Sequence, residues 1–203
     1  MGMRYTMVNQ LPENKMRLYP TKVINIIGGP GCGKSLFKST IVLNLLVRHH
    51  TVETVPDFAK ILVWQQDFES LKNQYAIAQR QYEMLNVLDG QVEFIVTEGS
   101  LPQLLFYNEY YEDNVCDVAK TRTQILDWYN QHNNINVMVR RGDEGRYNQA
   151  GRLQNEEGAH AVDRGLRDTL AREGIRYTFL EPDVKAIHAF AATLVDTPAK
   201  KET

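Results

Sequence analysis

Residues 28–35 constrain the fold of this chain more than any other part of its sequence. They read Gly-Gly-Pro-Gly-Cys-Gly-Lys-Ser, which satisfies the pattern G-x-x-x-x-G-K-[ST]. A β-branched run at 22–27 precedes them, and residues 35–48 follow with apolar side chains at helical spacing. A strand, a glycine-rich loop and a helix in this order predict a loop whose backbone N–H groups bind phosphate.

The residue types of this loop suit ATP-Mg as the ligand. Lys34 would reach the β- and γ-phosphates, and the Ser35 hydroxyl would ligate Mg²⁺. Cys32 could be a reactive thiol, because a helix N-terminus lowers a thiol pKa, or simply a small residue that fits the loop. The predicted nucleotide-binding residues are Gly28, Gly29, Gly31, Cys32, Gly33, Lys34, Ser35 and Leu36.

The rest of the chain repeats the alternation of strands and helices. Further strands are predicted at 52–55, 92–97, 135–139 and 175–180, and helices within 58–88 and at 121–131, 155–173 and 184–194. One face of a single long helix is predicted from Phe68, Leu71, Tyr75, Ala78, Tyr82 and Leu85. The pattern predicts an α/β fold with a five-stranded parallel sheet covered by helices on both faces.

Length and composition fit one domain. With 203 residues, of which 43% are hydrophobic, the chain can bury one core. We expect a polar leader at 1–21, the domain at 22–196 and a charged tail at 197–203. Within the domain, residues 140–155 are rich in Arg and Gly and are predicted to form an exposed, mobile lid.

Charge and cysteine usage exclude several classes of protein. The net charge of −2 gives no global attraction to nucleic acid, so such a contact would need a local basic patch. Two cysteines, one inside the glycine-rich loop, argue against a disulfide framework. No apolar run approaches the roughly 20 residues that cross a bilayer, and no signal peptide is evident. We therefore expect a soluble cytoplasmic protein with no membrane partner.

Two acids follow predicted strands, where ligands gather in parallel sheets. Glu98 ends the strand at 92–97 and could hold Mg²⁺, accept a proton, or be an ordinary loop acid. Asp57 follows the strand at 52–55 and could orient the phosphoryl acceptor or cap a helix after Pro56. Glu53 competes with Asp57 for the acceptor role.

Arginines supply the remaining candidates for catalysis and binding. Arg140, Arg141, Arg146 and Arg152 lie in the predicted lid, where guanidinium groups could close onto the phosphates. They could instead form a solvated surface or contact nucleic acid. Arg80 on the predicted long helix could contact the acceptor or simply cover a helix face.

The order of these segments resembles one family. The motifs that carry the likeness are the loop at 28–35, Val-Pro-Asp-Phe-Ala-Lys at 55–60, Trp64, Gln74, Gln79, Val-Thr-Glu-Gly at 96–99, the run 147–156 and Asp163. Together they resemble the P-loop kinases related to the ribosylnicotinamide kinase domain, many of which are encoded by bacteriophages. The resemblance covers about residues 22–194, and such kinases often have Asp where this chain has Glu98.

The resemblance implies a nucleoside-monophosphate-kinase-like sheet with a lid and ATP as donor. The expected activity is transfer of the γ-phosphate of ATP-Mg to a hydroxyl or phosphate of a nucleoside, a nucleotide or a related acceptor. One alternative is a kinase that acts on a modified base in DNA, such as 5-hydroxymethyluracil. Another is a P-loop ATPase or switch without an acceptor. If the chain is phage-encoded, it would act in the host cytoplasm.

Overall fold

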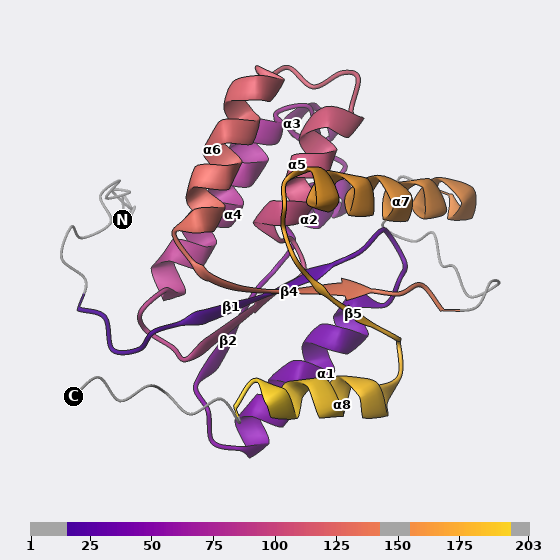
Figure 1. Ribbon diagram of the computed structural model, residues 1–203. Helices are drawn as coiled ribbons and strands as arrows, with labels where there is room; N and C mark the ends of the chain where they lie inside the picture. Colours follow the sequence, from indigo (N-terminus) through magenta and orange to yellow (C-terminus); the bar gives the residue numbers. More distant parts are fainter. Residues whose placement is uncertain (1–15, 143–154, 196–203) are drawn as a thin grey trace, which may run out of the picture.

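The computed structural model describes residues 16–142 and 155–195 of the chain. Five strands, all paired in parallel, form one sheet in the order β2-β3-β1-β4-β5 (Figure 1). Their bounds are β1 Lys22–Ile27, β2 Val52–Val55, β3 Phe94–Thr97, β4 Asn133–Val139 and β5 Thr178–Leu180. The predicted α/β fold with a five-stranded parallel sheet is confirmed.

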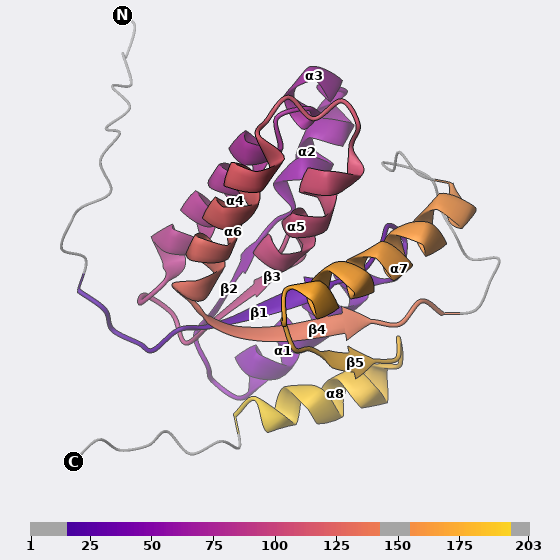
Figure 2. The same ribbon diagram turned by 45° about the horizontal axis from the view of Figure 1, so that its top comes forward.

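Helices cover both faces of the sheet. Their bounds are α1 Lys34–Val47, α2 Phe58–Gln65, α3 Phe68–Leu71, α4 Gln74–Leu88, α5 Leu101–Tyr110, α6 Val118–Asn130, α7 Glu156–Arg172 and α8 Val184–Thr193. Helices α1 and α8 lie side by side on one face, and α4, α5, α6 and α7 cover the other (Figure 2). Among the described residues, no helix is long and apolar enough to span a membrane.

The position of the central strand β1 explains why four of its six residues are β-branched. Val23 and Ile27 belong to the core beneath α4–α7, whereas Ile24 and Ile26 belong to the core beneath α1 and α8. All four side chains are fully buried. A strand with both faces covered is apolar at successive positions, and its end fixes where the following loop leaves the sheet.

The predicted single long helix over Phe68 to Leu85 is wrong, because the chain forms α3 and α4 in its place. Gln66 adopts a left-handed conformation with φ of 57° and ends α2. Asp67 and Asn73 then cap the two following helices, and Asn73 accepts a hydrogen bond from the N–H of Ala76 at 2.9 Å. Asx side chains favour such N-caps over helix interiors. Phe68 therefore belongs to the short helix α3.

Helix α5 was not predicted, because it is buried on nearly all sides and has no polar face. Seven of its ten residues are buried, and it packs against α4, α6 and α7. The start of α7, in contrast, agrees with the prediction, since the Asn155 side chain accepts a hydrogen bond from the N–H of Gly158 at 2.8 Å. Most of the predicted leader, residues 143–154 of the predicted lid and the predicted tail lie outside the described residues.

Candidate active site

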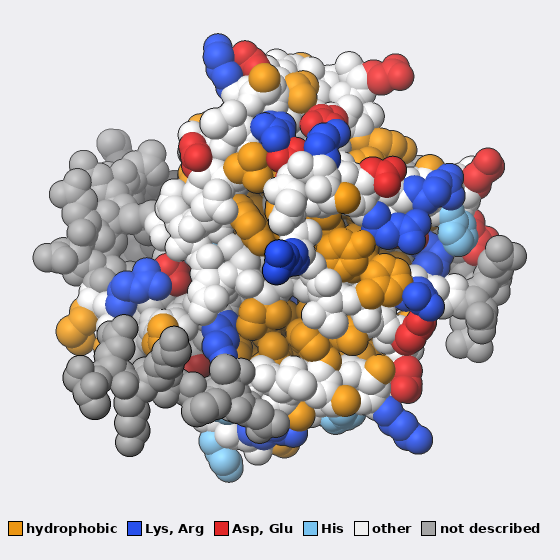
Figure 3. Space-filling model, viewed as in Figure 1, with side chains coloured by type: hydrophobic (Ala, Val, Ile, Leu, Met, Phe, Trp, Pro, Cys, Tyr) orange, Lys and Arg blue, Asp and Glu red, His pale blue; other side chains and the backbone are white. Residues whose placement is uncertain are grey.

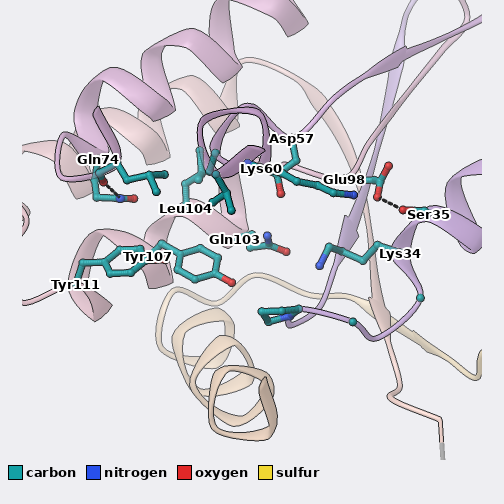
Figure 4. A pocket seen from close by; sticks show the side chains of 16 residues that line it. Lys34, Ser35, Asp57, Lys60, Gln74, Glu98, Gln103, Leu104, Tyr107 and Tyr111 are labelled. Atoms are coloured by element: carbon teal, nitrogen blue, oxygen red, sulfur yellow. Dashed lines mark hydrogen bonds between the residues drawn. The ribbon is translucent and has the colours of Figure 1, made fainter. Parts of the chain in front are cut away.

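A cavity of about 250 Å³ opens where β1, β2 and β3 end (Figure 4). The phosphate loop after β1 forms one end of it, through Lys34 and Ser35. Asp57 after β2 and Glu98 after β3 border the same space. Because the carboxyl ends of parallel strands meet at one edge of the sheet, three segments distant in sequence converge here.

The phosphate loop is folded around its own lysine. Lys34 Nζ donates to the carbonyl oxygens of Gly28 at 2.7 Å and Gly29 at 3.0 Å. Helix α1 begins at Lys34, so its first backbone N–H groups face the loop with the positive end of the helix dipole. The arrangement can bind an anionic phosphate group at the mouth of the cavity.

Glu98 is held by two donors from α1. Ser35 Oγ donates to Glu98 Oε2 at 2.7 Å, and Lys38 Nζ forms an ion pair with Glu98 Oε1. Burial alone would raise the pKa of Glu98, but the hydrogen bonds from Lys38 and Ser35 outweigh it and lower that pKa. Glu98 is therefore ionised at neutral pH, and both of its oxygens are engaged.

Asp57 combines a structural contact with a place at the cavity. Its side chain caps α2 by accepting a hydrogen bond from the N–H of Lys60 at 3.2 Å. Burial raises the pKa of Asp57, while the nearby charge of Lys34 opposes that shift. Asp57 thus has the predicted capping role and also lies at the cavity, where its carboxylate could accept a proton.

Gln81 on α4 fixes the backbone around Asp57. The buried amide donates from Nε2 to the Pro56 carbonyl at 3.0 Å and to Thr97 Oγ1 at 3.2 Å. Its Oε1 accepts from the N–H of Phe58 at 3.3 Å. One side chain therefore ties the ends of β2 and β3 together and holds the residues on either side of Asp57.

The other end of the cavity is apolar and aromatic. Leu71 and Leu104 line it, and the rings of Tyr107 and Tyr111 stack with centroids 5.8 Å apart. Figure 4 shows these tyrosines at the far side of the cavity from Ser35. Burial, with the neighbouring Tyr111, raises the pKa of Tyr107 well above its usual value. An apolar chamber of this kind suits a flat organic ligand.

Two glutamines place amide groups in the cavity wall. Gln103 Oε1 accepts from the N–H of Gly28 at 3.3 Å, which links α5 to the phosphate loop. Gln74 Nε2 donates to the Leu71 carbonyl at 2.7 Å. Gln103, Leu104 and Tyr107 come from α5, and Tyr111 follows directly after it. This helix has no readable periodicity, so the sequence did not indicate that these residues line a cavity.

Among the described residues, the predicted arginines do not line the cavity. Arg140 forms an ion pair with Glu181 at 2.6 Å and lies over the ring of Phe179 at the β5 side. Arg80 pairs with Glu83 at 3.3 Å on the exposed face of α4. Neither residue lines the cavity, and Arg146 and Arg152 lie outside the described residues.

The remaining predicted loop residues differ in their exposure. Gly31 and Gly33 line the cavity, whereas Leu36 is exposed on α1 and does not line it. Cys32 is buried, and that burial raises the pKa of its thiol. A thiol with a raised pKa is protonated at neutral pH, which favours a packing role for Cys32 over a reactive one.

Exposed arginines lie on α7. Lys and Arg side chains gather over this helix on the face seen in Figure 3. Arg164 and Arg167 are exposed there, whereas Arg172 is paired with Glu109 at 2.7 Å. The same helix also carries the exposed acids Glu157 and Asp168, so its surface is of mixed charge.

Comparison with known proteins places the chain in a fold and a family. A family model described as an AAA domain matches residues 23–186. A comparison with curated protein sequences found no match.

Solved structures share the fold at low sequence identity. Deoxyadenosine kinase from M. mycoides, with the products dCMP and a flexible dCDP bound, is 18% identical with a TM-score of 0.54, over 85% of this chain and 96% of that one. The NadR protein in complex with NAD and AMP-PNP is 12% identical with a TM-score of 0.60, over 85% of this chain and 50% of that one. YorR protein from Bacillus subtilis, in complex with phosphorylated GDP, is 16% identical with a TM-score of 0.50, over 85% of this chain and 95% of that one.

These likenesses show that the chain has the P-loop NTPase fold. This chain spans only half the length of the NadR structure.

Proposed function

The chain belongs to the AAA domain family, and from that premise we propose that it is a P-loop kinase that transfers the γ-phosphate of ATP to a small acceptor. The acceptor class is a nucleoside, a nucleotide or a related compound. The observation that carries the proposal is the cavity, which continues from the phosphate loop past Asp57 into an aromatic chamber. A P-loop protein that only hydrolyses nucleotide has no need of such a chamber. The deoxyadenosine kinase among the similar structures supports the same class.

The donor phosphates would occupy the end formed by Lys34 and the N-terminus of α1. The oxygens of Ser35 and Glu98 lie 2.7 Å apart at this end, and such hard oxygen ligands suit Mg²⁺. Within the described ranges, no group of three or more His, Cys, Asp or Glu residues could hold a metal ion. That agrees with Mg²⁺, which is usually bound through one or two protein oxygens together with substrate phosphates. Bound there, Mg²⁺ would neutralise charge on the phosphoryl group.

Asp57 is the proposed base. Glu98 is engaged by Ser35 and Lys38 and has a lowered pKa, so it is the weaker proton acceptor of the two. The raised pKa of Asp57 makes it the stronger one. As the acceptor oxygen bonds to the γ-phosphorus, the bond to the β–γ bridging oxygen breaks and ADP leaves. The proton of the acceptor hydroxyl passes to the Asp57 carboxylate.

The test is transfer of labelled γ-phosphate from ATP-Mg to a panel of acceptors. The panel contains nucleosides, nucleoside monophosphates, nicotinamide riboside, and duplex DNA with normal or hydroxymethylated bases. Lys34→Ala serves as the inactive control, and omission of Mg²⁺ tests the metal. Label on one acceptor, lost in the variant, is the expected result and identifies the substrate.

Two other results would change the proposal. Label on DNA alone, with strong salt dependence, would move the acceptor to a base in DNA. Label released only as free phosphate would replace the kinase by a P-loop ATPase.

A further inference from the structure

Three separate segments meet at the second glycine of the phosphate loop. Asp163, in the middle of α7, accepts a hydrogen bond at Oδ1 from the N–H of Gly29 at 2.7 Å. Arg141, two residues after β4, donates from Nε to Asp163 Oδ2 at 2.7 Å. Its guanidinium also reaches the Ala159 carbonyl at 3.4 Å. Both charged side chains are largely buried, at 12% exposed for Arg141 and 18% for Asp163.

These contacts act on one peptide unit of the loop. The N–H of Gly29 and the C=O of Gly28 belong to the same planar trans peptide and point in opposite directions. Asp163 binds the N–H, and Lys34 Nζ binds the C=O at 2.7 Å. Fixing the direction of the N–H therefore fixes the direction of the carbonyl that holds Lys34.

The residues on both sides of this peptide are glycines, so its orientation needs a restraint. Gly28 and Gly29 both lack a Cβ, so the peptide between them can rotate with little steric resistance. A Cβ on Gly29 would lie 2.4 Å from Asp163 Oδ1 and 2.9 Å from the Ala159 carbonyl oxygen. The loop must therefore carry glycine to let α7 approach, and it needs Asp163 to keep the freed peptide in one orientation.

Arg141 makes the carboxylate compatible with a phosphate site. An unpaired carboxylate beside the loop would repel the phosphates of a bound nucleotide. The ion pair with Arg141 balances that charge and orients both oxygens of Asp163. The pair does not line the cavity, so it acts on a ligand only through the loop.

We propose that Asp163 and Arg141 are positioning residues for the phosphate loop. They set nucleotide affinity because they fix the orientation of the Gly28–Gly29 peptide, and thereby the position of the Lys34 ammonium group. This inference rests on the proposed nucleotide site, although not on the identity of the acceptor. It gives α7 a second task besides covering the sheet.

The test is a direct measurement of nucleotide binding by calorimetry, with the full chain, Mg²⁺ and the non-hydrolysable analogue AMP-PNP. Asp163→Ala is expected to weaken binding by about tenfold or more, which corresponds to about 1.4 kcal/mol. Asp163→Asn keeps an oxygen for the Gly29 N–H and should recover part of the affinity. Asp168→Asn, an exposed acid on the same helix, is the matched control and should bind as wild type does.

Further readouts separate positioning from a general loss of structure. The KM for ATP should rise in Asp163→Ala, while the KM for the acceptor stays the same. Arg141→Met should also weaken nucleotide binding. The variant that carries both Asp163→Ala and Arg141→Met should lose less binding free energy than the sum of the losses in the two single variants. If Asp163→Ala does not fold, Asp163→Asn and Arg141→Met decide the question by the same titration.

The outcomes distinguish this inference from the kinase proposal. Nucleotide affinity within twofold of wild type in Asp163→Ala, or equal increases in both KM values, would overturn the inference. A wild-type chain that binds AMP-PNP but phosphorylates no acceptor would refute the kinase while leaving the binding comparison intact. A wild-type chain that binds no nucleotide would overturn both.

Discussion

Replacement of Gln81 by Met is the sharpest test of how the site is held. Methionine has a similar length and apolar stem, so it fills the same space on α4 without donating or accepting as an amide does. The change removes three hydrogen bonds, to the Pro56 carbonyl, to Thr97 Oγ1 and from the Phe58 N–H. Gln81 is 1% exposed, so water cannot replace these partners.

The expected loss of stability follows from these contacts. Each bond contributes about 1 kcal/mol net, and a buried polar group left without a partner costs about 1–3 kcal/mol. The free energy of unfolding should therefore fall by about 3 kcal/mol. For a domain of this size that corresponds to a decrease in Tm of about 6–12 °C. The turnover rate should fall by about tenfold or more, because the backbone around Asp57 is released.

Urea denaturation and phosphate-transfer kinetics measure the two effects, with Gln79→Met as the control. Gln79 lies on the same helix, but it is exposed, and its Nε2 donates to Glu83 Oε1 at 3.1 Å. The control should change the free energy of unfolding by less than about 0.5 kcal/mol. A Gln81→Met variant as stable and as active as this control would refute the reasoning that Gln81 holds the Asp57 segment.

Two further predictions concern Asp57 and Gly165. Asp57→Asn should reduce phosphate transfer by about a hundredfold or more, yet unfold at higher urea concentration at neutral pH, because Asn still caps α2 and carries no buried charge. Burial raises the pKa of Asp57 in the folded state above 3.8. The stability gained by the Asn variant over wild type is therefore present above the folded pKa, and it disappears as the pH falls through that pKa towards 3.8. Urea denaturation of both proteins at several pH values would check this. Gly165→Ala places a Cβ 2.3 Å from the buried ring of Phe106. It should lower the free energy of unfolding by about 1 kcal/mol, despite the better helix propensity of Ala, and a more stable variant would contradict the packing described.

The sequence predicted those parts of the fold that depend on local chemistry. The strand before Gly28, the loop itself and the Asn155 cap each carry their signal within a few neighbouring residues. Asp57 and Glu98 could be expected at one sheet edge, because both follow strands that must be parallel in an alternating fold. The break at Asn73 was missed, since apolar spacing alone continues across two successive helices.

The contacts that shape the site could not be predicted in this way. Gln81, Gln103 and Asp163 bond to partners far away in the sequence. Nothing in the sequence around a polar residue on a helix indicates that it has a buried partner. Lys38 looks like any exposed lysine of α1 until Glu98 is placed against it. Helix α5 is buried around most of its circumference, so it lacked the periodicity that reveals a surface helix.

The distance in sequence between the phosphate loop and its partners has a consequence for how the protein is made. Gln103 and Asp163 lie 75 and 134 residues away from the glycines that they bind. Ribosomes add about 5–20 residues per second, so the loop leaves the ribosome on the order of 10 s before Asp163 has been synthesised. The nascent chain should therefore acquire tight nucleotide binding only once α7 has docked, which makes nucleotide binding a marker of completed folding.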